Sequence, residues 1–140
     1  MKRVPYGQRY WYDHMASGDV PLWERFMQQF PGVYSGVAYD VPVGGVPAHA
    51  EEPVVAGGAN MAALYRRRID AVGFKENQTD IIEVKPRASM SAIGQVLGYA
   101  HLYAQEHGDP QNVKAILVTD QADPDLASFA AAQGVLLVVV

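Results

Sequence analysis

The hydrophobic and polar positions of the chain follow two periods, which predict alternating helices and strands. The first helix begins at Asp19, which can cap it, and ends before Pro31; its apolar positions are Leu22, Trp23, Phe26, Met27 and Phe30. A second helix begins after Ser89 or Ser91 and ends at Gly108, with an apolar face made of Ile93, Val96, Leu97, Ala100 and Ala104. A third helix is predicted over residues 124–132.

The strands are short and largely apolar, and they are predicted over residues 33–43, 63–74, 79–85, 113–119 and 135–140. The polar run from Lys75 to Gln78 predicts a hairpin between the second and third strands. The resulting order is α-β-β-β-α-β-α-β, without an internal repeat. An antiparallel hairpin followed by βαβ crossovers predicts an α/β fold, with one mixed sheet flanked by helices.

Two segments follow neither period. Residues 1–17 form an aromatic N-terminal arm in which Tyr10, Trp11 and Tyr12 could stack on bases, although packing in a core or an interface explains them equally well. Residues 44–60 are rich in Gly, Pro and Ala. A structureless stretch of that length in a small domain is expected to be functional or mobile.

Composition narrows the class of protein. A chain of 140 residues with 49% hydrophobic residues fits one domain over residues 1–140, and the absence of cysteine excludes disulfides and cysteine-bound zinc. No secretory signal or bilayer-length apolar run is present, so we expect a cytoplasmic protein of a bacterial cell, or of a virus assembling in one, without a membrane partner. The net charge of −4 argues against bulk attraction to nucleic acid, so any DNA contact must be local.

The candidate chemistry lies on the predicted hairpin. Alternate residues of a strand share a face, so Glu83 and Lys85 project together from an otherwise apolar strand. If Glu76 and Asn77 form a two-residue turn, Asp70 lies directly opposite Glu83. A slip of one residue would move Asp70 to the opposite face, so the register is itself a prediction.

Two carboxylates that meet at one point repel each other unless a cation lies between them. Oxygen ligands of this kind suit Mg²⁺ or Mn²⁺, which keep several waters and accept phosphate oxygens. Lys85 can orient or help to deprotonate a metal-bound water, or offset charge in the transition state of phosphodiester hydrolysis. The alternative is a cross-strand ion pair, which is common and weakly stabilising. Charges inside apolar strands favour the metal site, because such residues are seldom buried without a function.

Three segments in order resemble the motifs of the PD-(D/E)XK nuclease superfamily, which has the restriction-endonuclease-like fold. They are Arg68-Ile69-Asp70, Ile81-Ile82-Glu83-Val84-Lys85 and Gln95-Val96-Leu97-Gly98-Tyr99. The third is similar to the Gln-x-x-x-Tyr helix motif of the RecB-type branch. The resemblance covers residues 66 to about 103 and implies an α-β-β-β-α-β core. Ile69 stands where the family name has proline, which many members lack.

The resemblance also implies roles for single residues. Asp70 and Glu83 would be metal ligands, the backbone carbonyl of Val84 would add a third, and Lys85 would be the catalytic lysine. In relatives with the helix motif the glutamine lies beside the active site and the tyrosine faces the nucleic acid, which are the roles of Gln95 and Tyr99 here.

The two predicted helices beside the hairpin leave two choices open. Some relatives use an acidic residue of the first helix as an extra ligand, for which Glu24 is the candidate, but a solvated helix face is the favoured interpretation of Glu24. Gly94 and Gly98 would let the second helix approach the sheet or another backbone closely, although ordinary packing explains them as well.

Two function classes follow. The favoured one is an Mg²⁺-dependent deoxyribonuclease that acts on ends, single strands or branched DNA, with nucleic-acid contacts from Arg66, Arg67, Arg87 and Tyr99. The alternative is a structural or interaction component of a viral or DNA-repair assembly with weak or no cleavage. The net acidity, the aromatic arm and the strand over residues 135–140 point to a protein partner or a homo-oligomer.

Overall fold

A computed structural model of the protein describes residues 1–9, 11–12, 15–45 and 66–140. Its helices and strands follow the predicted order. They are α1 (Asp19–Gln29), β1 (Gly36–Val43), β2 (Arg67–Phe74), β3 (Thr79–Val84), α2 (Met90–His107), β4 (Val113–Thr119), α3 (Pro124–Ala132) and β5 (Leu136–Val139), with a short 3-10 helix η2 (Pro110–Asn112) before β4. Most of the predicted loop over residues 44–60 lies outside the described residues.

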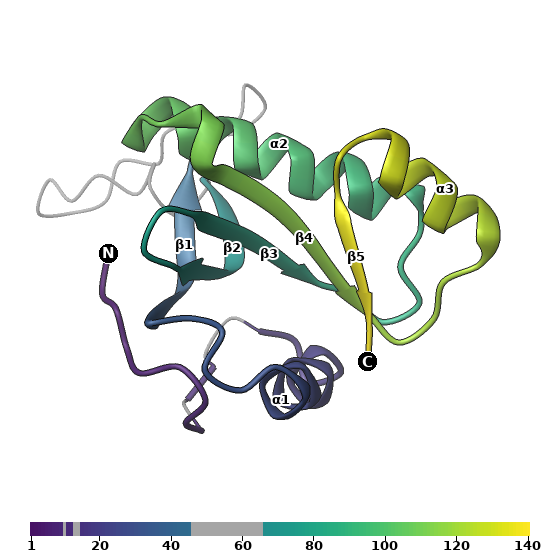
Figure 1. The fold of residues 1–140 in the computed structure, drawn as a ribbon, viewed down its shortest axis with the longest axis horizontal. Coiled ribbons are helices and arrows are strands. Elements are labelled where there is room, and N and C mark those ends of the chain that lie inside the picture. The colour runs from purple at the N-terminus through teal and green to yellow at the C-terminus, as the bar shows by residue number, and fades with distance from the viewer. Residues whose placement is uncertain (10, 13–14, 46–65) are drawn as a thin grey trace, which may run out of the picture.

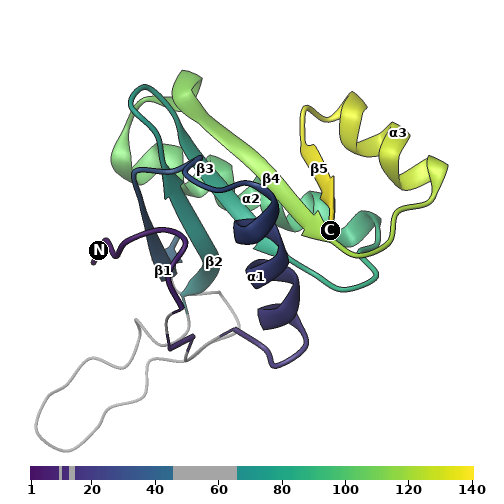
Figure 2. The same cartoon turned by 60° about the horizontal axis from the view of Figure 1, so that its bottom comes forward.

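The five strands form one sheet in the order β1-β2-β3-β4-β5. The pairs β1/β2 and β2/β3 are antiparallel, whereas β3/β4 and β4/β5 are parallel. Helices α2 and α3 cover one face of this sheet and α1 covers the other (Figures 1 and 2). The predicted mixed sheet flanked by helices is therefore confirmed.

Each face of the sheet has its own core. Ile81 of β3 packs in the cluster under α2 and α3, whereas its neighbour Ile82 packs in the cluster under α1 with Trp23. Both isoleucines are fully buried, which explains why the sequence of β3 is apolar at successive positions instead of alternating. None of the helices in the described part of the chain has both the length and the hydropathy needed to cross a membrane.

The N-terminal arm packs along the β1 side of the sheet and against α1. Val4 forms a bridge with Val37 of β1, and the Tyr6 hydroxyl donates a hydrogen bond of 2.8 Å to the backbone carbonyl of Phe30. Trp11 is 81% exposed and is the most exposed aromatic residue in the described part of the arm. Tyr10 lies outside the described residues.

The start of α1 differs from the prediction. Gly18 occupies the N-cap position, and Asp19 is the first helical residue. The predicted cap at Asp19 is therefore wrong. A carboxylate in the first turn still interacts favourably with the helix dipole. Asp19 therefore marks the start of the helix, but the N-cap lies one residue earlier than predicted.

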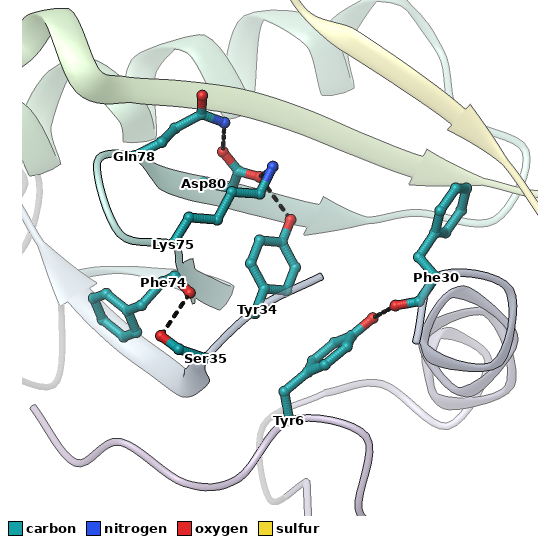
Figure 3. Close-up of polar contacts among 8 residues, drawn as sticks. All are labelled: Tyr6, Phe30, Tyr34, Ser35, Phe74, Lys75, Gln78 and Asp80. Carbon is teal, nitrogen blue, oxygen red and sulfur yellow. Dashed lines mark hydrogen bonds and ion pairs between the residues drawn. The ribbon is translucent and has the colours of Figure 1, made fainter. Parts of the chain in front are cut away.

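A buried polar cluster fixes the turn end of the hairpin (Figure 3). Asp80 is 1% exposed and accepts hydrogen bonds from the Tyr34 hydroxyl (2.7 Å) and from Gln78 Nε2 (2.6 Å), while Lys75 Nζ lies 3.4 Å from its carboxylate. The Tyr34 ring covers Gly73, the residue paired with Asp80, and a Cβ on Gly73 would come within 2.5 Å of that ring. The cluster thus ties the hairpin to the segment that precedes β1.

Replacing Tyr34 by Phe is expected to lower the free energy of unfolding by about 2 kcal/mol, because a hydrogen bond to a buried charged carboxylate is lost. Urea denaturation monitored by circular dichroism measures this change. Comparison of the double variant Tyr34→Phe/Asp80→Asn with the two single variants isolates the contribution of the hydrogen bond. If the bond stabilises the fold, the double variant should lose less free energy of unfolding than the sum of the two single losses. Full additivity would show that the bond contributes nothing.

Gly94 and Gly98 lie on the exposed face of α2. A Cβ at either position would meet no atom of the described residues within 4 Å. The glycines therefore do not let the helix approach the sheet, and each lowers helix stability relative to alanine. We expect Gly94→Ala and Gly98→Ala each to raise the free energy of unfolding by about 0.5–1 kcal/mol in urea denaturation. A lower stability in either variant would show that the exposed helix face is wrongly assigned.

Candidate active site

The hairpin register brings two acidic side chains together. Ala71 pairs with Ile82, and the chain turns between Lys75 and Gln78, where the Lys75 N–H donates to the Gln78 carbonyl (2.8 Å). The predicted register is therefore confirmed over residues 71–74 and 79–82, and Asp70 and Glu83 are the next residues of the two strands.

Asp70 is held in place by the backbone of the facing strand. The Val84 N–H donates a hydrogen bond of 2.9 Å to Asp70 Oδ2. Glu83 is 7% exposed, and its Oε2 atom is buried without a hydrogen-bond partner among the described residues. Burying a carboxylate oxygen without a partner is costly, so this oxygen points to a cation that the side chain would bind. The donor set therefore fits a divalent ion that prefers oxygen ligands.

Burial is the main cause of the raised pKa values of Asp70 and Glu83. It raises the pKa of Glu83, and the charge of Asp70 and a hydrogen bond from the protonated Glu83 carboxyl to Asp70 raise it further. Burial also raises the pKa of Asp70, although the Val84 N–H opposes that shift. Lys85 lowers the pKa of both carboxyls because it lies close enough to favour their charged forms. Without a cation, the pair therefore shares one proton at neutral pH instead of carrying two charges.

Helix α1 contributes a third acidic residue, Asp19, which the sequence predicted as a helix cap. The charge of Asp19 raises the pKa of both Asp70 and Glu83. The pKa of Asp19 itself is raised by burial and lowered by Lys85. A signal was present in the sequence, because Asp19 precedes Leu22, Trp23 and Phe26 at helical spacing and so belongs to the face that α1 turns to the sheet.

Glu24 points elsewhere. Its Oε1 lies 3.7 Å from Arg9 Nε, and it lines a hollow of about 300 Å³ together with Gly7, Arg9, Met27 and Gln28. No interaction links Glu24 to the hairpin carboxyls within the described ranges. Asp19 therefore replaces Glu24 as the acidic residue that α1 brings to the site.

The ligand set is a pair and not a complete cage. Among the described residues, no three Asp, Glu or His side chains lie close enough together to hold a metal by themselves. This arrangement is typical of Mg²⁺, which binds one or two carboxylates and completes its shell with waters and substrate phosphates.

The second helix places its motif residues beside the hairpin. Gln95 Nε2 donates a hydrogen bond of 2.7 Å to the Tyr99 hydroxyl. The pKa of Tyr99 is raised by burial and, more weakly, by the charges of Glu83 and Asp70, while Arg67 lowers it. Tyr99 thus lies within electrostatic range of both carboxyls and of Arg67, and the structure brings these residues into one region.

The arginines predicted to contact nucleic acid differ in their surroundings. Arg66 donates to the carbonyl of Gly44 (2.6 Å) and to Glu106 Oε1 (2.7 Å), so its guanidinium is engaged inside the protein. Arg67 and Arg87 are exposed. The sequence alone does not distinguish the three arginines, because the partner of Arg66 lies 40 residues away in the chain.

Comparison with known proteins supports the fold. No known family model matches the sequence, and no curated protein matches it. Two solved structures do: a repair endonuclease from Pyrococcus abyssi (17% identity, TM-score 0.51) and an EndoMS-dsDNA2 complex (18% identity, TM-score 0.51). Each alignment covers 95% of this chain and 49% of the other, so the chain spans about half the length of these proteins. The fold of this chain is therefore similar to that of about half of each of these two proteins.

Proposed function

We propose that the protein is a metal-dependent deoxyribonuclease in which Asp70 and Glu83 bind Mg²⁺ or Mn²⁺. The observation that carries this proposal is the buried Oε2 of Glu83, which accepts no hydrogen bond from the described residues, in a carboxyl whose pKa the charge of Asp70 raises. A structural ion pair would leave no such oxygen, because Lys85 or another cation would satisfy it.

Each residue of the site has a part in phosphodiester hydrolysis. A divalent ion bound here would polarise the phosphate and lower the pKa of a bound water. The Val84 N–H keeps Asp70 oriented toward Glu83, and the carbonyl of Val84 is a further candidate ligand. The Lys85 ammonium group would orient the attacking water or offset the negative charge that develops on the phosphate oxygens. Asp19 adds negative charge that favours a cation between the hairpin carboxyls.

We assign the protein to the RecB-type branch of the PD-(D/E)XK nucleases within this proposal. The order of the motifs supports this assignment, because the first lies on β2, the second on β3 and the residue after it, and the third on α2. The effect of the Glu83 and Asp70 charges on the pKa of Tyr99 also supports it. The names of the two structural neighbours, a repair endonuclease and a dsDNA complex, favour DNA as substrate. Because the net charge is −4, DNA binding would depend on local groups, chiefly Arg67, Arg87 and Tyr99.

A second candidate function is a component of a larger assembly. The last strand of the sheet, β5, exposes Leu136 (59%) and Val139 (51%), and an apolar edge strand is prone to pair with another chain. A protein partner or a second copy of this chain would cover this edge. In that role cleavage would be weak or absent.

The two functions are separated by a cleavage assay with the purified protein. Linear, circular, single-stranded and branched DNA are incubated with Mg²⁺, with Mn²⁺ or with EDTA. The nuclease proposal predicts products from at least one substrate with either metal and none with EDTA. The absence of products from every substrate, together with a stable oligomer in solution, would favour the assembly role.

A further inference from the structure

A hollow of about 400 Å³ opens just beyond the carboxyl ends of β3 and β4. It is lined by Arg87, Ala88, Gln121, Ala122 and Asp123. It begins two residues after Lys85, and because β3 and β4 run in parallel, the loops that follow them are neighbours. The hollow therefore lies at the same end of β3 as Glu83 and Lys85, which is the end of the sheet where α/β proteins commonly bind ligands.

The walls of this hollow are fixed by hydrogen bonds between the two loops. The Arg87 N–H donates to Asp120 Oδ1 (2.8 Å), and the Ala88 N–H donates to Thr119 Oγ1 (3.0 Å). Arg87 has a φ of +48°, a left-handed conformation that is strained for a residue other than glycine. Such strain persists only where the surroundings hold it, and it is found most often at functional sites. The hollow is thus preformed.

The lining groups suit a polar aromatic ring better than a single anion. Arg87 makes no side-chain hydrogen bond or ion pair with the described residues, so its five donors are available. Gln121 offers one donor and one acceptor group, and Asp123 keeps a second oxygen after Oδ1 has accepted from the Leu126 N–H (2.8 Å). The negative charges of Asp120 and Asp123 weaken the attraction of a free phosphate.

We infer that this hollow binds one nucleotide of the strand that is cut, adjacent to the phosphate at Asp70 and Glu83. The small side chains of Ala88 and Ala122 leave room for the flat base. Its polar edge contacts Gln121 and Asp123, and its phosphate contacts Arg87. A volume of about 400 Å³ is at the lower end of the range for small-molecule sites, which a nucleoside fits. This inference rests on the proposed nuclease function and names a subsite for its substrate.

Nuclear magnetic resonance of the full protein tests the subsite without any cleavage. Deoxynucleoside 5′-monophosphates are titrated, with deoxyribose 5-phosphate and inorganic phosphate as separate probes, and the backbone amide signals of Ala88 and Ala122 are followed. Saturable shifts are expected with the nucleotides and much smaller ones with the two probes that lack a base. Equal shifts with inorganic phosphate, or no shifts with any probe, would overturn the inference.

A matched pair of variants shows where the nucleotide binds. Ala122→Leu fills the hollow and should abolish the nucleotide-induced shifts, whereas Ala131→Leu, at an exposed position of α3, should leave them unchanged. Retained shifts in Ala122→Leu would place the nucleotide elsewhere and overturn the inference.

Cleavage of modified substrates separates this inference from the proposed function. A single abasic site is moved along a substrate that the parent protein cuts. The rate should fall roughly tenfold when the abasic site is next to the cut, as expected for one lost base contact, and Ala122→Leu should be insensitive to its position. Cleavage that is indifferent to every abasic position would overturn the subsite alone. No cleavage of any unmodified substrate would overturn the nuclease proposal instead.

Discussion

Replacing Asp70 by Asn is expected to lower the rate of metal-dependent DNA cleavage by about 10³-fold, since the loss of one charged ligand removes most of the electrostatic stabilisation of the transition state. The change is nearly isosteric, and the amide oxygen of Asn can still accept the hydrogen bond from the Val84 N–H. The fold should therefore survive. Single-turnover cleavage of the best substrate at saturating Mg²⁺ measures the effect.

The matched control for this experiment is Asp125→Asn. Asp125 is an exposed carboxylate in the first turn of α3 and outside the candidate site. The control should cleave at the parent rate, and both variants should have the circular dichroism spectrum of the parent. An Asp70→Asn protein that is folded and cleaves like the parent would remove Asp70 from the active site.

Replacing Glu83 by Gln is expected to abolish cleavage and, in EDTA, to stabilise the protein. Burial and the charge of Asp70 raise the pKa of Glu83 in the folded state above its unfolded value. A raised pKa means that Glu83 favours folding at low pH and loses this contribution as the pH rises through the folded pKa. Gln is neutral at every pH, so the variant does not pay the cost of a buried charge at high pH. The free energy of unfolding of the variant should exceed that of the parent by on the order of 2 kcal/mol at pH 8 and match it near pH 4.

Adding Mg²⁺ should make the parent more stable than Glu83→Gln at pH 8. An ion that binds only the folded parent raises its stability by about 2.7 kcal/mol at a hundred times the dissociation constant, whereas the Gln variant lacks a ligand and should gain little. Urea denaturation at pH 4 and pH 8, with Mg²⁺ or EDTA, tests both statements. A variant that is less stable than the parent at pH 8 in EDTA would show that the Glu83 carboxyl is satisfied by the protein itself.

The hairpin of the site could be predicted because its geometry is local. The turn at Glu76 and Asn77 sets the register, and the register alone places Asp70 opposite Glu83. Helix α3 was predicted over its observed residues, and its start is also local, because the Asp123 side chain caps it and Pro124 lies in its first turn.

The remaining features depend on contacts between distant parts of the chain. The electrostatic effect of Asp19 on the hairpin carboxyls depends on where α1 packs, which is on the face of the sheet opposite α2. Because the sequence does not reveal this packing, it was equally consistent with a helix cap at Asp19. The engagement of Arg66 depends on Glu106, and the need for glycine at Gly73 depends on the Tyr34 ring. Each of these pairs joins elements whose distance no periodic pattern reveals.

The central claim is that the hairpin carboxyls bind a divalent ion, and titration with Mn²⁺ tests it most directly. Free Mn²⁺ is counted by electron paramagnetic resonance in the parent protein, in Asp70→Asn and in Glu83→Gln. One site is expected in the parent, Mg²⁺ should compete for it, and both variants should lose it. Binding of Mn²⁺ at equal affinity in all three proteins, or no binding in the parent with DNA present, would contradict the claim.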